Sequence, residues 1–198
     1  MEITVKELQE WLADFATEVK AKKDYLSELD TPIGDGDHGN NMARGMEAYE
    51  ESLAKQKSTT ISDTFKILAM ALISKVGGAS GPLYGSAFMN ITKATKDITV
   101  ITHQAELGSL LETGLKGIQQ RGKAEVGDKT MVDVWFPVVT ALKEESLTSE
   151  KIEAAKESTK NLVAKKGRAS YLGERAVGHI DPGAASSALL FTTLLKFC

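Results

Sequence analysis

Apolar residues recur three and four positions apart along almost the whole chain, and this spacing constrains the fold more than any other feature. Such a period places the apolar side chains on one face of an α-helix. The first repeat runs from Val5 to Val19, and it follows Thr4 and Glu7, which together form a capping-box pattern. The sequence therefore predicts a helix at its start and helical segments along most of its length.

Further segments carry the same period. They cover about residues 39–53, 61–76, 82–91, 107–118, 131–142, 152–163 and 182–196. Gly77 is expected to end the third helix, Pro82 suits the first turn of the fourth, and Asp181 can cap the last. Alternation of period two appears only weakly, around residues 98–101, and is too short for a sheet. We therefore expect an all-α fold, with eight antiparallel helices in an up-and-down bundle.

Composition narrows the class of protein. A chain of 198 residues without a shift in composition is expected to form a single helical domain over residues 1–198. Its net charge is only −3 and no basic stripe is present, so we expect no nucleic-acid partner. No apolar run reaches the length of a bilayer span, and the start lacks a signal-peptide pattern, so we expect a cytoplasmic protein with no membrane partner. The only cysteine is Cys198, so a metal would be held by oxygen or nitrogen ligands.

The most informative stretch is an acidic loop between the first two predicted helices. Asp30, Asp35 and Asp37 lie there within eight residues, among glycines that allow a tight backbone path. Three carboxylates so close together repel one another, and a bound cation removes this cost. Hard oxygen ligands favour magnesium or manganese over zinc. The pattern predicts a metal site at these three residues.

Other interpretations of the acidic loop are weaker. An EF-hand would require an oxygen ligand at Gly39 and a glutamate at Met46, so the calcium pattern fails. The glycine spacing of a dinucleotide-binding fingerprint is present, but it follows a helix where that fold needs a strand. An ordinary solvated turn stays open as the structural alternative. If cations bridge the carboxylates to a phosphate, the backbone amides of residues 39–41 can also face the anion.

Two further loops contain small residues next to charged ones. The stretch GGASGPLYG at residues 77–85 lets backbone amides and the Ser80 hydroxyl approach a phosphate, although a plain helix–helix turn explains it equally well. Residues 121–131 carry basic side chains that fit a helix C-terminus followed by a cap.

The connection over residues 167–183 is too long for a plain bundle loop, and long loops in compact domains are usually functional. Arg168 or Arg175 can neutralise phosphate charge there. His179 fits a structural hydrogen bond as well as a functional role, and His103 is expected to have no functional role.

Taken together, the loops resemble a known family. The motifs IGDGDHG, GGASGPLYG, RGKAEVGDKTM and GRASYLGERAVGHIDPG occur in this order over essentially the whole chain. They resemble the ADP-binding L subunit of dihydroxyacetone kinases that are driven by the phosphoenolpyruvate phosphotransferase system. The resemblance implies an eight-helix barrel-like bundle that holds a nucleotide and two Mg²⁺ ions at one end.

The resemblance also implies roles for individual residues. Asp30, Asp35 and Asp37 match the magnesium ligands and form the catalytic centre. The residues that match nucleotide contacts are His38, Gly39, Asn40, Asn41, Ala79, Ser80, Gly122, Met131, Arg168, Asp181, Pro182 and Gly183.

The implied activity is phosphoryl transfer shared among subunits. Tightly bound ADP would receive a phosphoryl group from a phosphohistidine on the M subunit and pass it, as the γ-phosphoryl group of ATP, to dihydroxyacetone on the K subunit. Positioning and charge neutralisation dominate this chemistry, so the chain needs no base for the sugar. A homodimer is expected. Two alternatives stay open: an L subunit that uses exchangeable ATP, and a nucleotide-sensing partner of a transcription factor.

Overall fold

The structure is a computed structural model that describes residues 1–198, and it confirms the all-α prediction. Its α-helices are α1 (Val5–Ala21), α2 (Lys23–Asp30), α3 (His38–Gln56), α4 (Ile61–Lys75), α5 (Ser80–Ala94), α6 (Gln104–Gly122), α7 (Val132–Lys143), α8 (Ser149–Ser158) and α9 (Pro182–Leu194). Short 3₁₀ segments are η1 (Thr159–Asn161), η2 (Arg168–Ala176) and η3 (Leu195–Phe197). The weak alternation near residue 100 forms one isolated antiparallel bridge between Ile3 and Ile101.

The expected count of eight helices is wrong, because the chain forms a separate helix, α2, before the acidic loop. The backbone leaves the helical region at Lys22, where φ is −108° and ψ is 17°. A new helix then starts at Lys23 and ends at Asp30. Only Leu26 and Asp30 are buried on α2. A single buried apolar residue gives no hydrophobic period, so the sequence could not indicate this helix.

The helix expected to reach residue 163 ends earlier, at Ser158. After one 3₁₀ turn the backbone becomes extended at Leu162, with ψ of 147°. The carbonyl of Thr159 accepts a hydrogen bond from Lys129 Nζ at 2.5 Å. The Thr159 hydroxyl accepts from the backbone N–H of Asp181 at 3.0 Å. Tertiary partners therefore replace the helical hydrogen bonds at this point.

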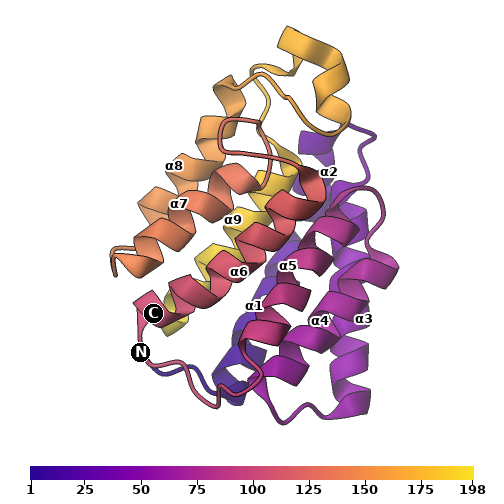
Figure 1. The fold of residues 1–198 in the computed structure, drawn as a ribbon. Helices are drawn as coiled ribbons and strands as arrows, with labels where there is room; N and C mark the ends of the chain where they lie inside the picture. The colour runs from indigo at the N-terminus through magenta and orange to yellow at the C-terminus, as the bar shows by residue number, and fades with distance from the viewer.

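The helices form a closed ring of mostly antiparallel neighbours (Figure 1). From α3 to α8 each helix packs against the next, while α9 packs against α7, α8 and α1, and α1 packs against α3. Both termini lie at one end of this ring, and α2 and the loop that contains η2 lie at the other. No helix combines the length and the apolar character that crossing a membrane requires.

Aromatic side chains fill the centre of the ring. Trp11, Phe65, Phe88, Trp135 and Phe191 follow one another with ring centroids 5.0 to 6.5 Å apart. They belong to one core of 46 buried residues, to which nearly every α-helix contributes. Edge-to-face and offset contacts of this kind add to the stabilisation from burial alone. The middle of the ring is therefore packed, and a cavity lies at one end of the bundle.

Candidate functional site

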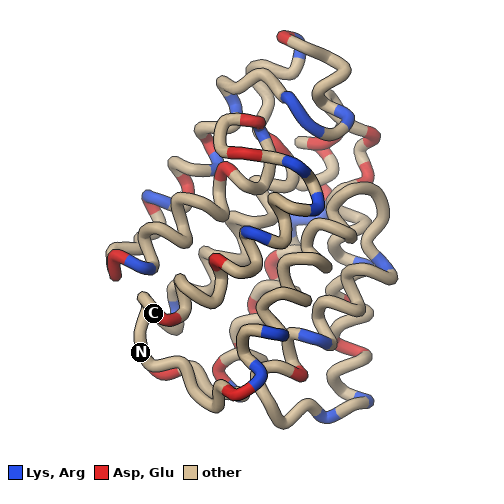
Figure 2. Tube along the Cα trace, viewed as in Figure 1, with Lys and Arg blue, Asp and Glu red and all other residues tan.

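A cavity of about 720 Å³ opens at the end of the bundle opposite the termini. Four connections line it: the α2–α3 loop, the α4–α5 turn, the α6–α7 loop and the stretch before α9. Its volume lies within the range of roughly 300–1,000 Å³ that is usual for small-molecule sites. Charged positions of both signs lie along these loops (Figure 2).

The three aspartates of the acidic loop lie together on one wall of this cavity. Each of Asp30, Asp35 and Asp37 can present an oxygen so that all three oxygens lie within 4.8 Å of one another. A tight turn after α2 makes this possible, since the Gly34 backbone N–H donates to the Asp30 carbonyl at 2.6 Å. A Cβ atom on Gly34 would lie only 1.9 Å from Asp30 Oδ1, so any other residue there would displace the Asp30 carboxylate.

Asp30 is the most buried member of this acidic cluster, with 8% of its surface exposed. Burial raises the pKa of Asp30, and the neighbouring Asp35 carboxylate raises it further. The backbone N–H groups of Asp37 and His38 oppose this effect by donating to Asp30 Oδ2 at 3.0 and 3.2 Å. On balance the surroundings of Asp30 therefore disfavour its ionised form.

The donor set of the cluster fits a magnesium ion. Three carboxylates offer hard oxygen ligands, and no cysteine lies among the residues that line the cavity. The one cationic side chain that touches the cluster is Arg168, whose guanidinium forms an ion pair with Asp35. A divalent cation would relieve the repulsion that this single, largely exposed pair leaves in place.

His38 begins α3 directly after the cluster and points into the protein. Only 6% of its surface is exposed, and burial lowers its pKa to about 4, so the ring is neutral at pH 7. Its Nδ1 atom lies 3.1 Å from Ser80 Oγ, and its Nε2 atom lies 2.9 Å from Ser186 Oγ. The imidazole therefore connects the acidic loop to the start of α5 and to α9.

The expectation that the amides of residues 39–41 face an anion is not met for two of them. The Gly39 N–H donates to Ser27 Oγ at 3.1 Å, and the Asn41 N–H donates to the Asp37 carbonyl at 2.9 Å. Gly39 is needed for packing, because a Cβ atom there would lie 1.7 Å from the Lys23 carbonyl oxygen. Asn40 is exposed on α3, and neither Gly39 nor Asn40 lines the cavity.

The other residues predicted as nucleotide contacts all line the cavity. They are His38, Asn41, Ala79, Ser80, Gly122, Met131, Arg168, Asp181, Pro182 and Gly183. They lie in or next to the four connections that line the cavity. Arg175 and His179, which the sequence left open, lie outside the lining, and the carbonyl of His179 accepts a hydrogen bond from Lys129.

Asp181 is both the N-cap of α9 and part of the cavity wall. Its Oδ2 atom accepts the backbone N–H of Ala184 at 2.7 Å, as the sequence predicted for a cap. Burial raises the pKa of Asp181 to about 7, although this N–H group and the nearby Lys129 ammonium pull it down. A largely buried carboxyl group that titrates near neutral pH at a cavity wall is typical of functional sites.

The sequence missed Lys129, which is 1% exposed and lines the cavity. Its backbone adopts a left-handed conformation with φ of 62°, which is uncommon for a residue other than glycine. Its ammonium group donates to the carbonyls of Thr159 and His179, and so fixes the chain on both sides of the long loop. No pattern near Lys129 distinguished it from the exposed lysines around it.

Basic residues also line the cavity. Besides Lys129 and Arg168, the lining contains Arg121, Lys165 and Lys166. Arg168 lies at the start of η2, and its ion pair with Asp35 joins the long loop to the acidic loop across the cavity. The run of basic residues at 165–168 was visible in the sequence, but its position over the cavity depends on the tertiary fold.

The sequence was compared with models of known protein families. The DAK2 domain matches residues 32–196, which is most of the chain. The chain belongs to the DAK2 domain family. The family predicted from the loop motifs is thereby confirmed.

Similar DAK2 proteins extend over the whole chain. One is the PEP-dependent dihydroxyacetone kinase 1, ADP-binding subunit DhaL, of Listeria innocua, which is 54% identical and matches 94% of this chain and 93% of its own length. Another is the PTS-dependent dihydroxyacetone kinase, ADP-binding subunit DhaL, of Lactococcus lactis, which is 49% identical with 98% of both chains covered. The similar Escherichia coli protein, also an ADP-binding subunit DhaL, is 40% identical. All three of these relatives are named as ADP-binding subunits of dihydroxyacetone kinases.

Solved structures agree with the DAK2 assignment at the level of the fold. The dihydroxyacetone kinase of C. freundii in its native form superposes with a TM-score of 0.76 over 96% of this chain, at 24% identity. The same enzyme in complex with AMP-PNP and Mg²⁺ gives a TM-score of 0.77 over the full chain, at 22% identity. This chain corresponds to about a third of that enzyme, 34% and 35% of its length in the two comparisons.

Proposed function

We propose that this chain is the ADP-binding subunit of a phosphoenolpyruvate-dependent dihydroxyacetone kinase. The observation that carries the proposal is the acidic cluster, which lies on one wall of a cavity of about 720 Å³ whose other walls supply basic side chains. A nucleoside diphosphate with bound magnesium combines negative phosphates and a positive metal ion in one ligand. The names of the full-length relatives in Listeria innocua, Lactococcus lactis and Escherichia coli point to the same ligand.

In this proposal Asp30, Asp35 and Asp37 hold two Mg²⁺ ions, and ADP stays tightly bound through the turnover. When bound, the metal ions neutralise phosphate charge and orient the phosphoryl group. The nucleotide contacts are His38, Gly39, Asn40, Asn41, Ala79, Ser80, Gly122, Met131, Arg168, Asp181, Pro182 and Gly183. For Gly39 and Asn40 the proposal rests on the motif alone, since neither lines the cavity.

The residues of the chain bind and position the nucleotide. Backbone amides at the N-terminus of α5, next to Gly78 and Ala79, offer donors to phosphate oxygens. Arg168 sits on the long loop and can move its guanidinium from Asp35 to a phosphate once a cation binds the carboxylate. This loop also keeps water away from the phosphates, which strengthens every charge interaction inside the cavity.

The remaining parts of the reaction lie on other subunits. An M subunit donates the phosphoryl group from a phosphohistidine, and a K subunit holds dihydroxyacetone and supplies the base. The chain itself forms one nucleotide-binding domain over residues 1–198 and assembles as a homodimer in the cytoplasm. Phosphoryl transfer needs mainly positioning and charge neutralisation from this subunit, which is what its cavity offers.

Reconstitution tests the division of labour. The isolated chain with ATP should not phosphorylate dihydroxyacetone, and activity should appear when a K-type partner is added. If phosphoenolpyruvate and the phosphotransferase proteins including M are then required for more than one turnover, the bound nucleotide does not exchange. Multiple turnovers with free ATP and K alone would instead establish exchangeable ATP. Turnover by the chain alone would overturn the proposal.

A further inference from the structure

A line of buried side-chain hydrogen bonds leads from the cavity wall into the core, and the proposed nucleotide contacts do not account for it. Ser80 Oγ lies 3.1 Å from His38 Nδ1, and His38 Nε2 lies 2.9 Å from Ser186 Oγ. Ser186 Oγ lies 2.7 Å from the Tyr84 hydroxyl, which lies 2.9 Å from Ser187 Oγ. Of these five residues only Ser80 and His38 touch the cavity.

Two contacts along this line have a fixed hydrogen-bond direction. Trp135 Nε1 can only donate, and it lies 3.1 Å from Ser187 Oγ. The Gly183 carbonyl can only accept, and Ser186 Oγ lies 3.1 Å from it. We call the connected groups the buried relay, which consists of Ser80, His38, Ser186, Tyr84, Ser187, Trp135 and the Gly183 carbonyl. Its four innermost side chains are fully buried, so bulk water cannot replace a missing partner.

The hydrogens of the buried relay match its contacts in number. With a neutral imidazole, the six side chains carry six polar hydrogens, and the structure contains six contacts among the groups. Buried polar hydrogens are rarely left without an acceptor, because an unpaired one costs more than an ordinary hydrogen bond contributes. Every contact should therefore receive one hydrogen.

Only one arrangement fills every contact. The bond to the Gly183 carbonyl uses the hydrogen of Ser186, so Ser186 cannot donate to His38 as well. His38 must then donate from Nε2 to Ser186 Oγ, and its Nδ1 atom must accept the hydrogen of Ser80. The opposite tautomer would leave the Gly183 contact without a hydrogen.

We infer that Ser186 holds His38 as the Nε2–H tautomer, so that Ser80 turns its hydrogen inward and presents its oxygen lone pairs to the cavity. Ser186 is then a positioning residue that acts on Ser80 through His38. The group that the ligand places at Ser80 is a hydrogen-bond donor: an O–H, an N–H or a metal-bound water. Phosphate oxygens meet the backbone amides of the α4–α5 turn instead. The identity of this ligand rests on the proposed function, whereas the tautomer does not.

Nuclear magnetic resonance of ring-labelled histidine reads the tautomer directly. The chain contains three histidines, so a His38→Gln variant assigns the signal of His38. At neutral pH the ligand-free wild type should show the Nε2–H form. Ser186→Ala removes the acceptor of that hydrogen and should shift the ring towards Nδ1–H. The matched control is Ser187→Ala, an equally buried neighbour on α9 without a contact to His38, which should keep the wild-type form.

An Nδ1–H ring in the wild type would overturn the inference, and so would an unchanged tautomer in a folded Ser186→Ala protein. If Ser186→Ala does not fold, the wild-type spectrum decides alone. Binding of ADP with Mg²⁺ provides a second readout, because Ser80→Ala should lower the affinity about tenfold through loss of one buried acceptor. An unchanged affinity would mean that the ligand donates no hydrogen bond to the Ser80 hydroxyl.

Nucleotide analogues then identify the donor. If Ser80→Ala costs no affinity for 2′,3′-dideoxy-ADP, the donor is a ribose hydroxyl, and if it costs none for inosine diphosphate, the donor is the adenine amino group. If Ser80→Ala lowers the affinity for both analogues as much as for ADP, the donor is a metal-bound water. Each of these three outcomes supports the inference. If wild type binds no ADP, the proposed function fails, and the tautomer of ligand-free His38 still decides the role of Ser186.

Discussion

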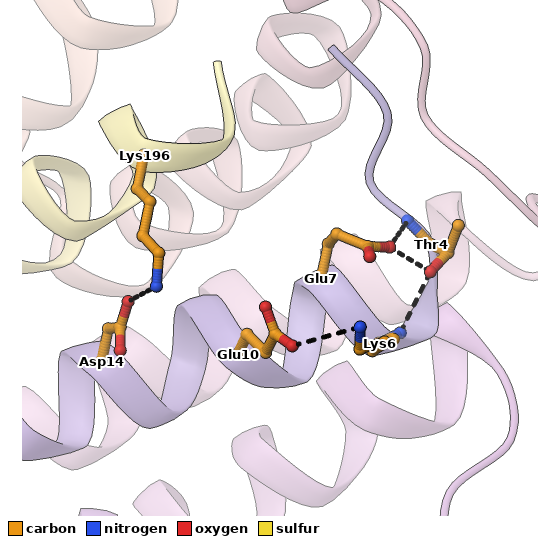
Figure 3. Close-up of polar contacts among 6 residues, drawn as sticks. All are labelled: Thr4, Lys6, Glu7, Glu10, Asp14 and Lys196. Atoms are coloured by element: carbon orange, nitrogen blue, oxygen red, sulfur yellow. Dashed lines mark hydrogen bonds and ion pairs between the residues drawn. The ribbon is translucent and has the colours of Figure 1, made fainter.

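The carboxylates at the two ends of the helical bundle differ in how many partners they have within the protein. At the end with the termini, each carboxylate of the pairs in Figure 3 has a partner within the protein. Glu7 accepts hydrogen bonds from the backbone N–H and the hydroxyl of Thr4, and Asp14 lies 3.0 Å from Lys196 Nζ. At the cavity end, three carboxylates share one cationic contact, the guanidinium of Arg168.

This difference separates residues that serve the fold from residues that serve a ligand. Partnered carboxylates near the termini cap a helix or join two elements, and they need nothing from outside. The aspartates at the cavity repel one another, and burial raises the pKa of Asp30. A cation that arrives with the nucleotide supplies the missing partner. The following predictions test whether the two ends really differ in this way.

The largest effect is expected from removing charge at the acidic cluster. Asp30→Asn, Asp35→Asn and Asp37→Asn should each abolish phosphoryl transfer. Without ligand these variants should be as stable as wild type or more so, because repulsion falls. With Mg²⁺ and ADP the order should reverse, since only wild type gains the full binding energy. Thermal melts with and without Mg²⁺ and ADP measure this crossover.

The matched control for the acidic cluster is Asp14→Asn at the other end, which removes the same charge from a surface ion pair. Its melting temperature should rise on ligand addition as much as that of wild type. Equal ligand-induced rises in all five proteins would mean that the three aspartates form an ordinary turn.

The second prediction concerns pH and Asp181. Burial raises the pKa of Asp181 from 3.8 to about 7, so the folded protein binds this proton more tightly than the unfolded chain. The contribution of Asp181 to the free energy of unfolding is therefore present below pH 4 and is lost as the pH rises to about 7. Asp181→Asn keeps a capping side chain but does not titrate. The variant should gain stability relative to wild type across this interval.

Denaturant unfolding of ligand-free protein at several pH values measures that difference. His38 contributes an opposite slope, because burial lowers its pKa to about 4, but this slope is common to both proteins and cancels. A difference that stays constant from pH 4 to pH 8 would show that Asp181 is ionised as easily as in the unfolded chain.

The sequence predicted those helices that bury several apolar residues on one face. Segments with several residues on one face, such as α1 and α6, were identified from their period. The helix α2 was missed because Leu26 is its only buried apolar residue. The break at Lys22 has no glycine or proline to mark it, and it became visible only in three dimensions.

The candidate site divides in the same way. Asp30, Asp35 and Asp37 lie within one loop, so their proximity followed from the sequence itself. Lys129 could not be identified, because its partners are 30 and 50 residues away along the chain. Ser186 was missed for the same reason, since its contact with His38 spans 148 residues.

The third prediction tests Lys129 as a structural group of the cavity end. Lys129→Met keeps most of the side-chain volume but leaves the carbonyls of Thr159 and His179 without their donor. We expect a loss of about 2 kcal/mol in the free energy of unfolding, the usual cost of unpaired buried polar groups. Lys196→Met near the termini removes an exposed pair and should cost less than about 1 kcal/mol. Equal losses in urea denaturation would contradict this contrast.

The smallest effect is expected at the start of α1. Thr4→Ala removes the N-cap side chain and its part of the capping box, which should cost about 1 kcal/mol of stability. The shift in melting temperature on addition of Mg²⁺ and ADP should stay at the wild-type value. A reduced ligand shift would show that the two ends of the bundle are coupled.

The central claim is that the acidic cluster holds magnesium against a nucleotide in the cavity, and native mass spectrometry of the purified chain tests it most directly. Wild type should carry the added mass of ADP together with Mg²⁺, and EDTA should remove both. Asp35→Asn, purified in parallel, should be recovered without them. A wild-type protein that carries neither ligand after incubation with ADP and Mg²⁺, or one that keeps ADP fully in EDTA, would contradict the claim.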